Sequence, residues 1–165
     1  MDDPDPAEST LTGGERAQLE SFLTDARTEI LSLLAGLTEE QARRRLVPSR
    51  TTLLGLVKHA VFVERVWFEV ALAGRTRAEL GLPETVEESF VLTDDDTVGS
   101  VSSLYRQAWS VAEAIAASHA LDDVALHNRR GPLSLRWIFL HLLRELARHA
   151  GHGDILREQI FAADG

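Results

Sequence analysis

Residues 141–152 run His141-Leu-Leu-Arg-Glu145-Leu-Ala-Arg-His149-Ala-Gly-His152, and this stretch decides both the fold and the candidate site. On a helix with roughly 100° between successive residues, Glu145, His149 and His152 all fall within about 80° of His141. The same side of the helix carries its apolar residues, Leu135, Ile138, Leu142, Leu146 and Leu156. The polar side chains therefore point toward the core of a helical protein.

A carboxylate and imidazoles that face a core need a partner, because an isolated buried charge is costly. Glu145 and His149 are one helical turn apart, so both can reach one point beside the helix. A third ligand must come from elsewhere, and His59 is the only other histidine that we place on an apolar helical face. Two histidines and one carboxylate match a catalytic zinc site, although nickel or iron(II) could also bind. The sequence therefore predicts His59, Glu145 and His149 as metal ligands.

The spacing alone leaves other assignments open. His141 with Glu145, and His149 with His152, are equally well spaced to share a metal ion. A purely structural alternative also exists, in which these groups bond to one another or to the arginines of the same stretch.

Outward from this stretch, four segments have the apolar spacing of helices and no strand pattern separates them. A capping-box pattern, Thr38 to Gln41, predicts a short helix between the first two segments. We expect an all-α domain over residues 14–165, an antiparallel four-helix bundle, preceded by a flexible tail over residues 1–13. The predicted long helices cover approximately residues 19–37, 51–73, 97–118 and 135–160.

Composition excludes several classes of function. The 165 residues, 44% of them apolar, suit one domain, and the absence of cysteine excludes disulfides, thiolate metal sites and a cysteine nucleophile from this chain. A net charge of −9 argues against a nucleic-acid-binding surface. We find neither a signal peptide nor an apolar run of about 18 residues, so we expect a soluble, cytoplasmic protein without membrane partners.

Two runs of sequence resemble a known family. They are residues 53–68, LLGLVKHAVFVERVWF, and residues 134–158, SLRWIFLHLLRELARHAGHGDILRE. Together they resemble the DinB-like superfamily and, within it, the branch related to the N-terminal domain of mycothiol-dependent maleylpyruvate isomerase. The resemblance spans nearly the whole chain, and the second run is its most specific part.

The resemblance implies a four-helix bundle with a divalent metal bound between its second and last long helices. By position, the implied ligands are His59, Glu145 and His149, and His152 becomes a substrate-side residue. The isomerase has a further C-terminal domain that contributes to its active site. This chain ends at Gly165, so we do not expect it to isomerise maleylpyruvate.

The hypothesis that follows is a metal-dependent transferase that adds mycothiol, or a related low-molecular-weight thiol, to an electrophilic small molecule. A zinc ion would hold the thiol as its nucleophilic thiolate. Arg148 or His152 would orient anionic groups of the substrate.

Two alternatives use the same residues. A metal-dependent hydrolase would need a general base, for which Glu64 and His152 are the candidates. A non-catalytic, stress-related binding or dimerisation module would have a structural metal. In that module Trp67, Phe68 and Trp109 would lie at a homodimer interface, although core packing is the ordinary role of such residues.

Overall fold

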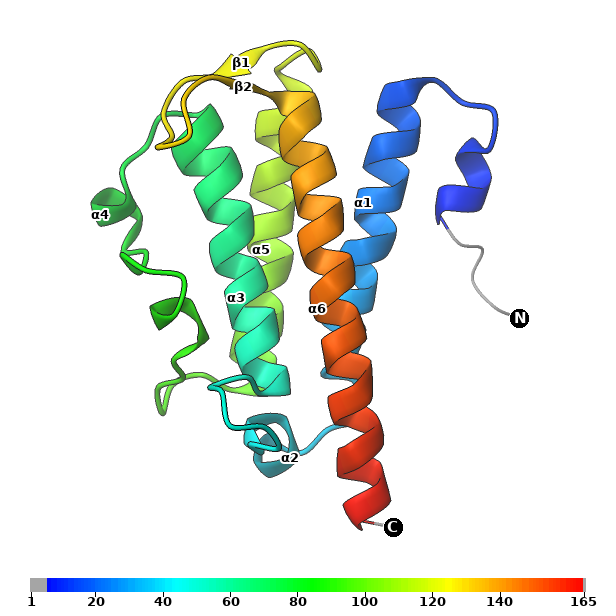
Figure 1. Ribbon diagram of the computed structural model, residues 1–165, viewed down its shortest axis with the longest axis vertical. Helices are drawn as coiled ribbons and strands as arrows, with labels where there is room; N and C mark the ends of the chain where they lie inside the picture. The colour runs from blue at the N-terminus through cyan, green and yellow to red at the C-terminus, as the bar shows by residue number, and fades with distance from the viewer. Residues whose placement is uncertain (1–5, 165) are drawn as a thin grey trace.

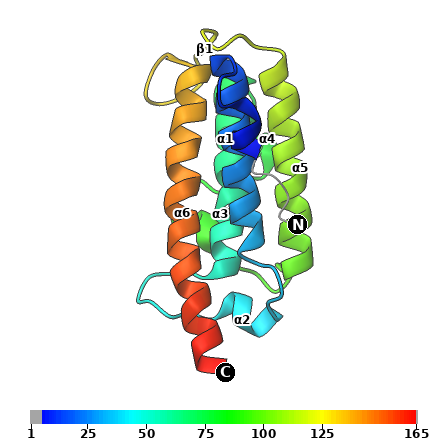
Figure 2. The same ribbon diagram turned by 90° about the vertical axis from the view of Figure 1, so that its right-hand side faces the viewer.

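The computed structural model describes residues 6–164, which are mainly helical (Figure 1). Four long helices lie side by side in both views (Figures 1 and 2). Helix α3 continues beyond Arg65 as a π-helical segment, η2 (Val66–Leu72), so that the two together form one long rod. The bounds of the four long helices are α1 Glu15–Ser32, α3 Leu53–Arg65, α5 Val98–Ala117 and α6 Leu135–Asp164.

The direction of the helices differs from a simple antiparallel order. Figure 1 shows α3 and α5 rising in the same direction, whereas α1 and α6 both descend. The long connection after η2 causes this, because it returns the chain to the opposite end of the domain before α5 begins. Along this connection lie two short elements, α4 (Arg77–Leu80) and the 3-10 helix η3 (Glu88–Phe90).

Side-chain caps fix where several helices begin. Thr38 and Gln41 form the predicted capping box, which opens the short helix α2 (Glu39–Arg43). The Thr52 hydroxyl accepts a hydrogen bond of 3.0 Å from the Gly55 amide at the start of α3. Such caps satisfy amide groups that have no partner within the helix. The cap on Thr52 thereby helps to set the position of His59 along α3.

Two segments differ from the sequence-based expectation. The loop before α6 contains a pair of two-residue strands, β1 (Val124–Ala125) and β2 (Leu133–Ser134), which pair antiparallel. We expected no strand there, and strands of this length are too short to produce a period. Part of the expected tail, residues 1–5, lies outside the described residues, whereas Pro6–Thr10 form a 3-10 helix, η1, that packs against α1.

Helix α3 occupies the centre of the core. Every residue from Leu53 to Glu64 is buried except Lys58, so the two buried ionisable side chains of this range, His59 and Glu64, need partners. Glu64 has one, because the Arg27 guanidinium of α1 donates to both of its carboxylate oxygens at 2.7 and 2.8 Å. His59, 2% exposed, faces the other way, toward α6.

The aromatic residues considered for a subunit interface mostly belong to this core. Trp67 is 6% exposed and Phe68 is 1% exposed, so core packing is confirmed for both. Trp109 is partly exposed, and its indole N–H donates to Glu113 at 2.6 Å. No helix within residues 6–164 has the length and apolar character needed to span a membrane.

Candidate metal centre

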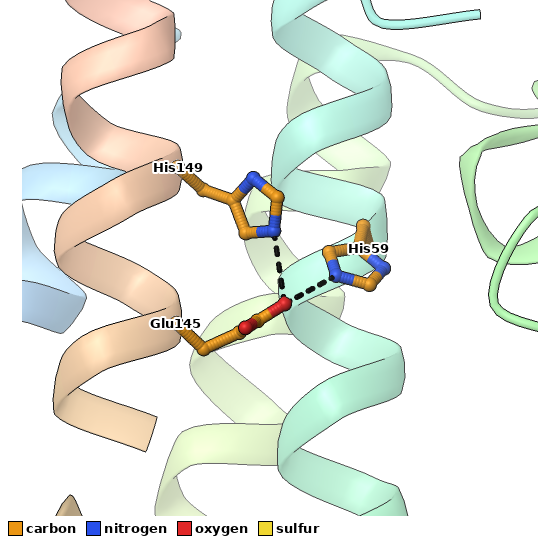
Figure 3. Close-up of side chains that lie close together, drawn as sticks. All are labelled: His59, Glu145 and His149. Atoms are coloured by element: carbon orange, nitrogen blue, oxygen red, sulfur yellow. Dashed lines mark hydrogen bonds and ion pairs between the residues drawn. The ribbon is translucent and has the colours of Figure 1, made fainter. Parts of the chain in front are cut away.

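Three side chains from two helices converge on one point (Figure 3). His59 comes from α3, while Glu145 and His149 come from successive turns of α6. One carboxylate oxygen, Glu145 Oε1, lies 3.1 Å from His149 Nε2 and 3.6 Å from His59 Nε2. Within the described chain these residues form a group in which one potential ligand atom from each lies within 4.8 Å of the others. The structure thus brings together the three residues that the sequence singled out.

The His59 ring is held by residues of the long connection. Its Nδ1 lies 2.7 Å from the Ser89 hydroxyl, which donates its own hydrogen to the Val86 carbonyl at 2.5 Å. A hydroxyl has one hydrogen, so the Ser89 oxygen must accept the bond from His59 Nδ1–H. Phe90 stacks on the same ring, with 4.1 Å between ring centroids. These contacts fix both the orientation and the tautomer of His59.

The tautomer has a direct consequence for Nε2. With the hydrogen on Nδ1, a neutral His59 presents the Nε2 lone pair to the Glu145 carboxylate, and this nitrogen is buried without a hydrogen-bond partner in residues 6–164. Burial, partly offset by Glu145, lowers the pKa of His59, which favours the neutral ring. Two acceptor atoms then face each other, one of them a buried nitrogen.

The carboxylate of Glu145 adds negative charge at the same point. The hydrogen bond from His149 holds the pKa of Glu145 well below its ordinary value, with a smaller contribution from the Arg148 charge and despite a burial effect in the opposite direction. His149 also leaves a nitrogen, Nδ1, buried and without a partner in the described chain. An ionised carboxylate, a lone pair directed at it and a second imidazole fit the donor set of a divalent metal ion.

The two residues predicted for the substrate side differ in position. Arg148 lines the cavity beside the centre and donates a hydrogen bond of 2.7 Å to Glu145 Oε2. His152 is exposed, and its ring contacts His149 with 5.8 Å between centroids. It is not part of the cavity wall. Arg148 can therefore meet a molecule in the cavity directly, whereas His152 acts at most through its neighbour.

His141, which the spacing offered as another ligand, has different neighbours. Its ring stacks on Trp137 at 4.9 Å and meets Trp67 edge-on at 4.8 Å. It lies in the cavity wall about one helical turn before Glu145 and outside the group of three.

The cavity beside the centre has a volume of about 880 Å³, which is in the range of small-molecule sites. Its walls come from α3 and η2, from α6, from residues 84–87 of the long connection and from residues 127–130 of the loop between β1 and β2. His59 and Glu145 both reach this wall, so a molecule in the cavity has access to the centre.

A comparison with models of protein families shows to which family this chain belongs. A model of the mycothiol-S-transferase (MST) family matches residues 18–162, which include all three converging side chains. The chain belongs to the mycothiol-S-transferase family. Membership of the MST family agrees with the resemblance to the DinB-like superfamily, while the closer likeness to the isomerase domain stays a prediction. No curated protein matches the sequence.

Several residues around this candidate site were not identified from the sequence. Ser89 and Phe90 lie in a connection without periodicity, and only the fold brings them to His59. Glu64, considered as a general base, is wrong for that role, because Arg27 occupies both of its oxygens and it does not line the cavity.

Proposed function

We propose that this chain transfers mycothiol, or a related low-molecular-weight thiol, to an electrophilic small molecule at a divalent metal centre. The ligands would be His59, Glu145 and His149, with zinc as the expected ion, on a DinB-like four-helix bundle. The observation that carries the metal site is the buried His59 Nε2, whose lone pair faces an ionised carboxylate 3.6 Å away with no hydrogen between them. A cation between these atoms would remove the repulsion.

A divalent metal bound there would supply the positive charge that keeps a thiol ionised at neutral pH. The thiol must come from outside, because the chain has no cysteine. In the transfer, taken as an addition, the thiol loses its proton and its sulfur forms a bond to the electrophilic carbon, whose π bond breaks, and the released proton is added to the neighbouring carbon. The family match supports mycothiol as the thiol and this transfer as the reaction class.

The protein's own residues prepare the centre for this reaction. Ser89 holds His59 in the tautomer that leaves Nε2 free, and Arg148 holds one oxygen of Glu145. Fixing ligand side chains in this way raises metal affinity. The apolar side of the cavity, which includes Phe62 and Val66, limits access of water to the bound thiol. We assign Arg148, and more remotely His152, to the orientation of substrate groups.

A hydrolytic reaction is less well supported by the same geometry. Activation of water at the centre would require a general base, and Glu64 is committed to Arg27 in the core. The other candidate, His152, lies outside the cavity wall. Transfer of an external thiol needs no such base in the chain, because the thiolate itself is the nucleophile.

Metal analysis of purified, zinc-loaded protein tests the centre. We expect about one zinc ion per chain in the wild type and loss of the ion in His59→Ala and His149→Ala. The matched control is His127→Ala, which removes an exposed imidazole from the same cavity but not from the group of three. Full occupancy in both ligand variants would refute the site.

Calorimetric titration with mycothiol tests the thiol. We expect the zinc-loaded protein to bind mycothiol, and to bind glutathione and free cysteine more weakly. Removal of the metal with a chelator should abolish both thiol binding and transfer to an electrophile, and zinc should restore them. Failure to bind any of the three thiols would contradict the transferase proposal even if the metal is present.

A further inference from the structure

A second cluster of side chains lies beside the same cavity, at a distance from the proposed ligands, and two of its three members line the cavity. It consists of the rings of Trp67, Trp137 and His141, whose centroids lie 4.8 to 5.3 Å apart. Trp67 lies roughly two helical turns after His59, and Trp137 lies roughly two turns before Glu145. At about 1.5 Å per residue, each separation is about 12 Å along the helix. Because η2 rises where α6 descends, both shifts lead toward the same end of the domain (Figure 1).

One arginine covers this aromatic cluster. The Arg130 guanidinium, from the loop between β1 and β2, lies 5.3 Å from the Trp67 ring centroid and 5.8 Å from that of Trp137. Cation–π attraction to an aromatic ring does not use the N–H groups of a guanidinium, which can still bind a carboxylate with two hydrogen bonds. These contacts therefore place a positively charged group beside the aromatic cluster without using its hydrogen-bond donors.

The cavity has more positive than negative side chains, although the chain as a whole carries a net charge of −9. Five arginines and three glutamates line it. Arg148 is paired with Glu145, and Arg77 donates to backbone carbonyls of the long connection. For residues 6–164, no carboxylate lies within ion-pair distance of Arg129, Arg130 or Arg144. The two remaining acids of the cavity wall are Glu84 and Glu87, and neither forms an ion pair with these three arginines.

We propose that the electrophile carries an anionic group, a carboxylate in the simplest case, which binds to Arg130 and Arg144 while the reactive carbon lies near the metal ligands. This inference rests on the proposed transferase function. Arg144 lies on α6 just before Glu145, and its guanidinium contacts His141 at 3.4 Å, so it borders both the aromatic cluster and the centre. A planar substrate body would lie against Trp67 and His141, which both line the cavity.

A suitable pair of test compounds is 4-phenyl-3-buten-2-one and its para-carboxylate, which share one reactive enone. Addition of a thiol forms a bond from sulfur to the β-carbon, and the alkene π electrons move toward the carbonyl group. The proton released by the thiol is finally added to the α-carbon. Nothing leaves the substrate, and neither oxidant nor reductant is required.

The first measurement uses metal-free protein and no thiol, so that it does not depend on transfer. By isothermal titration calorimetry, we expect the wild type to bind the carboxylate enone about tenfold more tightly than the neutral enone, since a hydrogen bond to a charged group has about this effect. Arg130→Gln should remove this preference, and Arg130→Lys should retain part of it. The control, Arg106→Gln, removes an exposed arginine of α5 outside this cavity and should change nothing.

The second measurement uses zinc-loaded protein, mycothiol and both enones. In Arg130→Gln we expect KM for the carboxylate enone to rise about tenfold with little change in kcat, and no change for the neutral enone. Equal affinity of the wild type for the two compounds, or equal weakening of both by Arg130→Gln, would overturn the inference. Absence of transfer to both compounds, with the calorimetric preference intact, would instead overturn the proposed function and support an anion-binding role of Arg130.

Discussion

Replacement of Ser89 by alanine tests how the centre is held together. The Ser89 hydroxyl accepts the hydrogen of His59 Nδ1 and donates to the Val86 carbonyl. Val86 keeps a hydrogen bond from the Ser89 backbone amide at 3.2 Å, so Ser89→Ala leaves only the buried Nδ1–H without its partner. An unsatisfied buried donor costs about 1–3 kcal/mol. We expect the free energy of unfolding of the metal-free protein to fall by this amount at most, because a change of tautomer at His59, which turns its hydrogen toward Glu145, offsets part of the cost.

The same change should also weaken metal binding. Without Ser89, His59 can move its hydrogen to Nε2 and donate it to Glu145, which lies 3.6 Å away. That tautomer has no lone pair for a metal. Removing a hydrogen-bond partner of a ligating histidine typically reduces metal affinity by about 10–100-fold. At a fixed free zinc concentration, this factor corresponds to a further loss of about 1.4–2.7 kcal/mol in the stability of the zinc-loaded protein.

Two assays separate these contributions. Urea unfolding of Ser89→Ala and wild type, with and without buffered zinc, should show a larger stability difference when zinc is present. Competition with a chromogenic chelator should give the loss of zinc affinity directly. Ser110→Ala, which removes an exposed hydroxyl from α5, is the control and should match the wild type in both assays. A zinc affinity of Ser89→Ala within about twofold of the wild type would refute the proposed tautomer control.

Two further predictions concern ion pairs away from the centre. Arg27→Met leaves Glu64 charged and buried, so urea unfolding should show a loss of about 3–5 kcal/mol, and the added change Glu64→Leu should recover most of it. A double variant no more stable than Arg27→Met would contradict this account. Burial raises the pKa of Asp96, but hydrogen bonds from Lys58 and Thr93 outweigh burial and hold that pKa below its ordinary value. Wild type should therefore be more stable than Lys58→Met by about 1 kcal/mol at neutral pH, and this advantage should disappear as the pH falls below about 3.8. An advantage that persists at pH 2 would show that Lys58 acts through packing.

The sequence predicted the local geometry of the centre better than its surroundings. Glu145 and His149 share a helix face because of their spacing alone, so any fold that buries this face brings them together. The position of His59 required only that its helix pack against α6. Ser89 had no comparable signal, because its contact with His59 depends on the path of a connection that has neither helical nor strand periodicity.

The parallel direction of α3 and α5 is indicated by a feature of the sequence other than hydrophobic periodicity, namely the length of the connection between them. Adjacent antiparallel helices are joined by short loops, whereas the segment between η2 and α5 is much longer than such a loop requires. A connection of this length can run the full length of a helix and return the chain to its starting end. Its length therefore favours a parallel neighbour. The connection runs along one side of the domain (Figure 1), and one of its residues, Ser89, contacts His59.

A comparison of Glu64 with Glu145 shows why the pattern of apolar helix faces could not by itself identify the candidate metal site. Glu64 and Glu145 both lie on helices whose inner faces are buried, and both pair with an arginine. Arg27, from another helix, binds both oxygens of Glu64, so its charge is balanced and its lone pairs are used. Arg148, from the same helix, binds only Oε2 of Glu145 and leaves Oε1 to two imidazoles, one of which has no hydrogen to donate. Arg27 reaches both oxygens of Glu64 because α1 packs against α3, a tertiary contact that the pattern of apolar faces does not specify, and this contact separates a structural ion pair from the proposed metal centre.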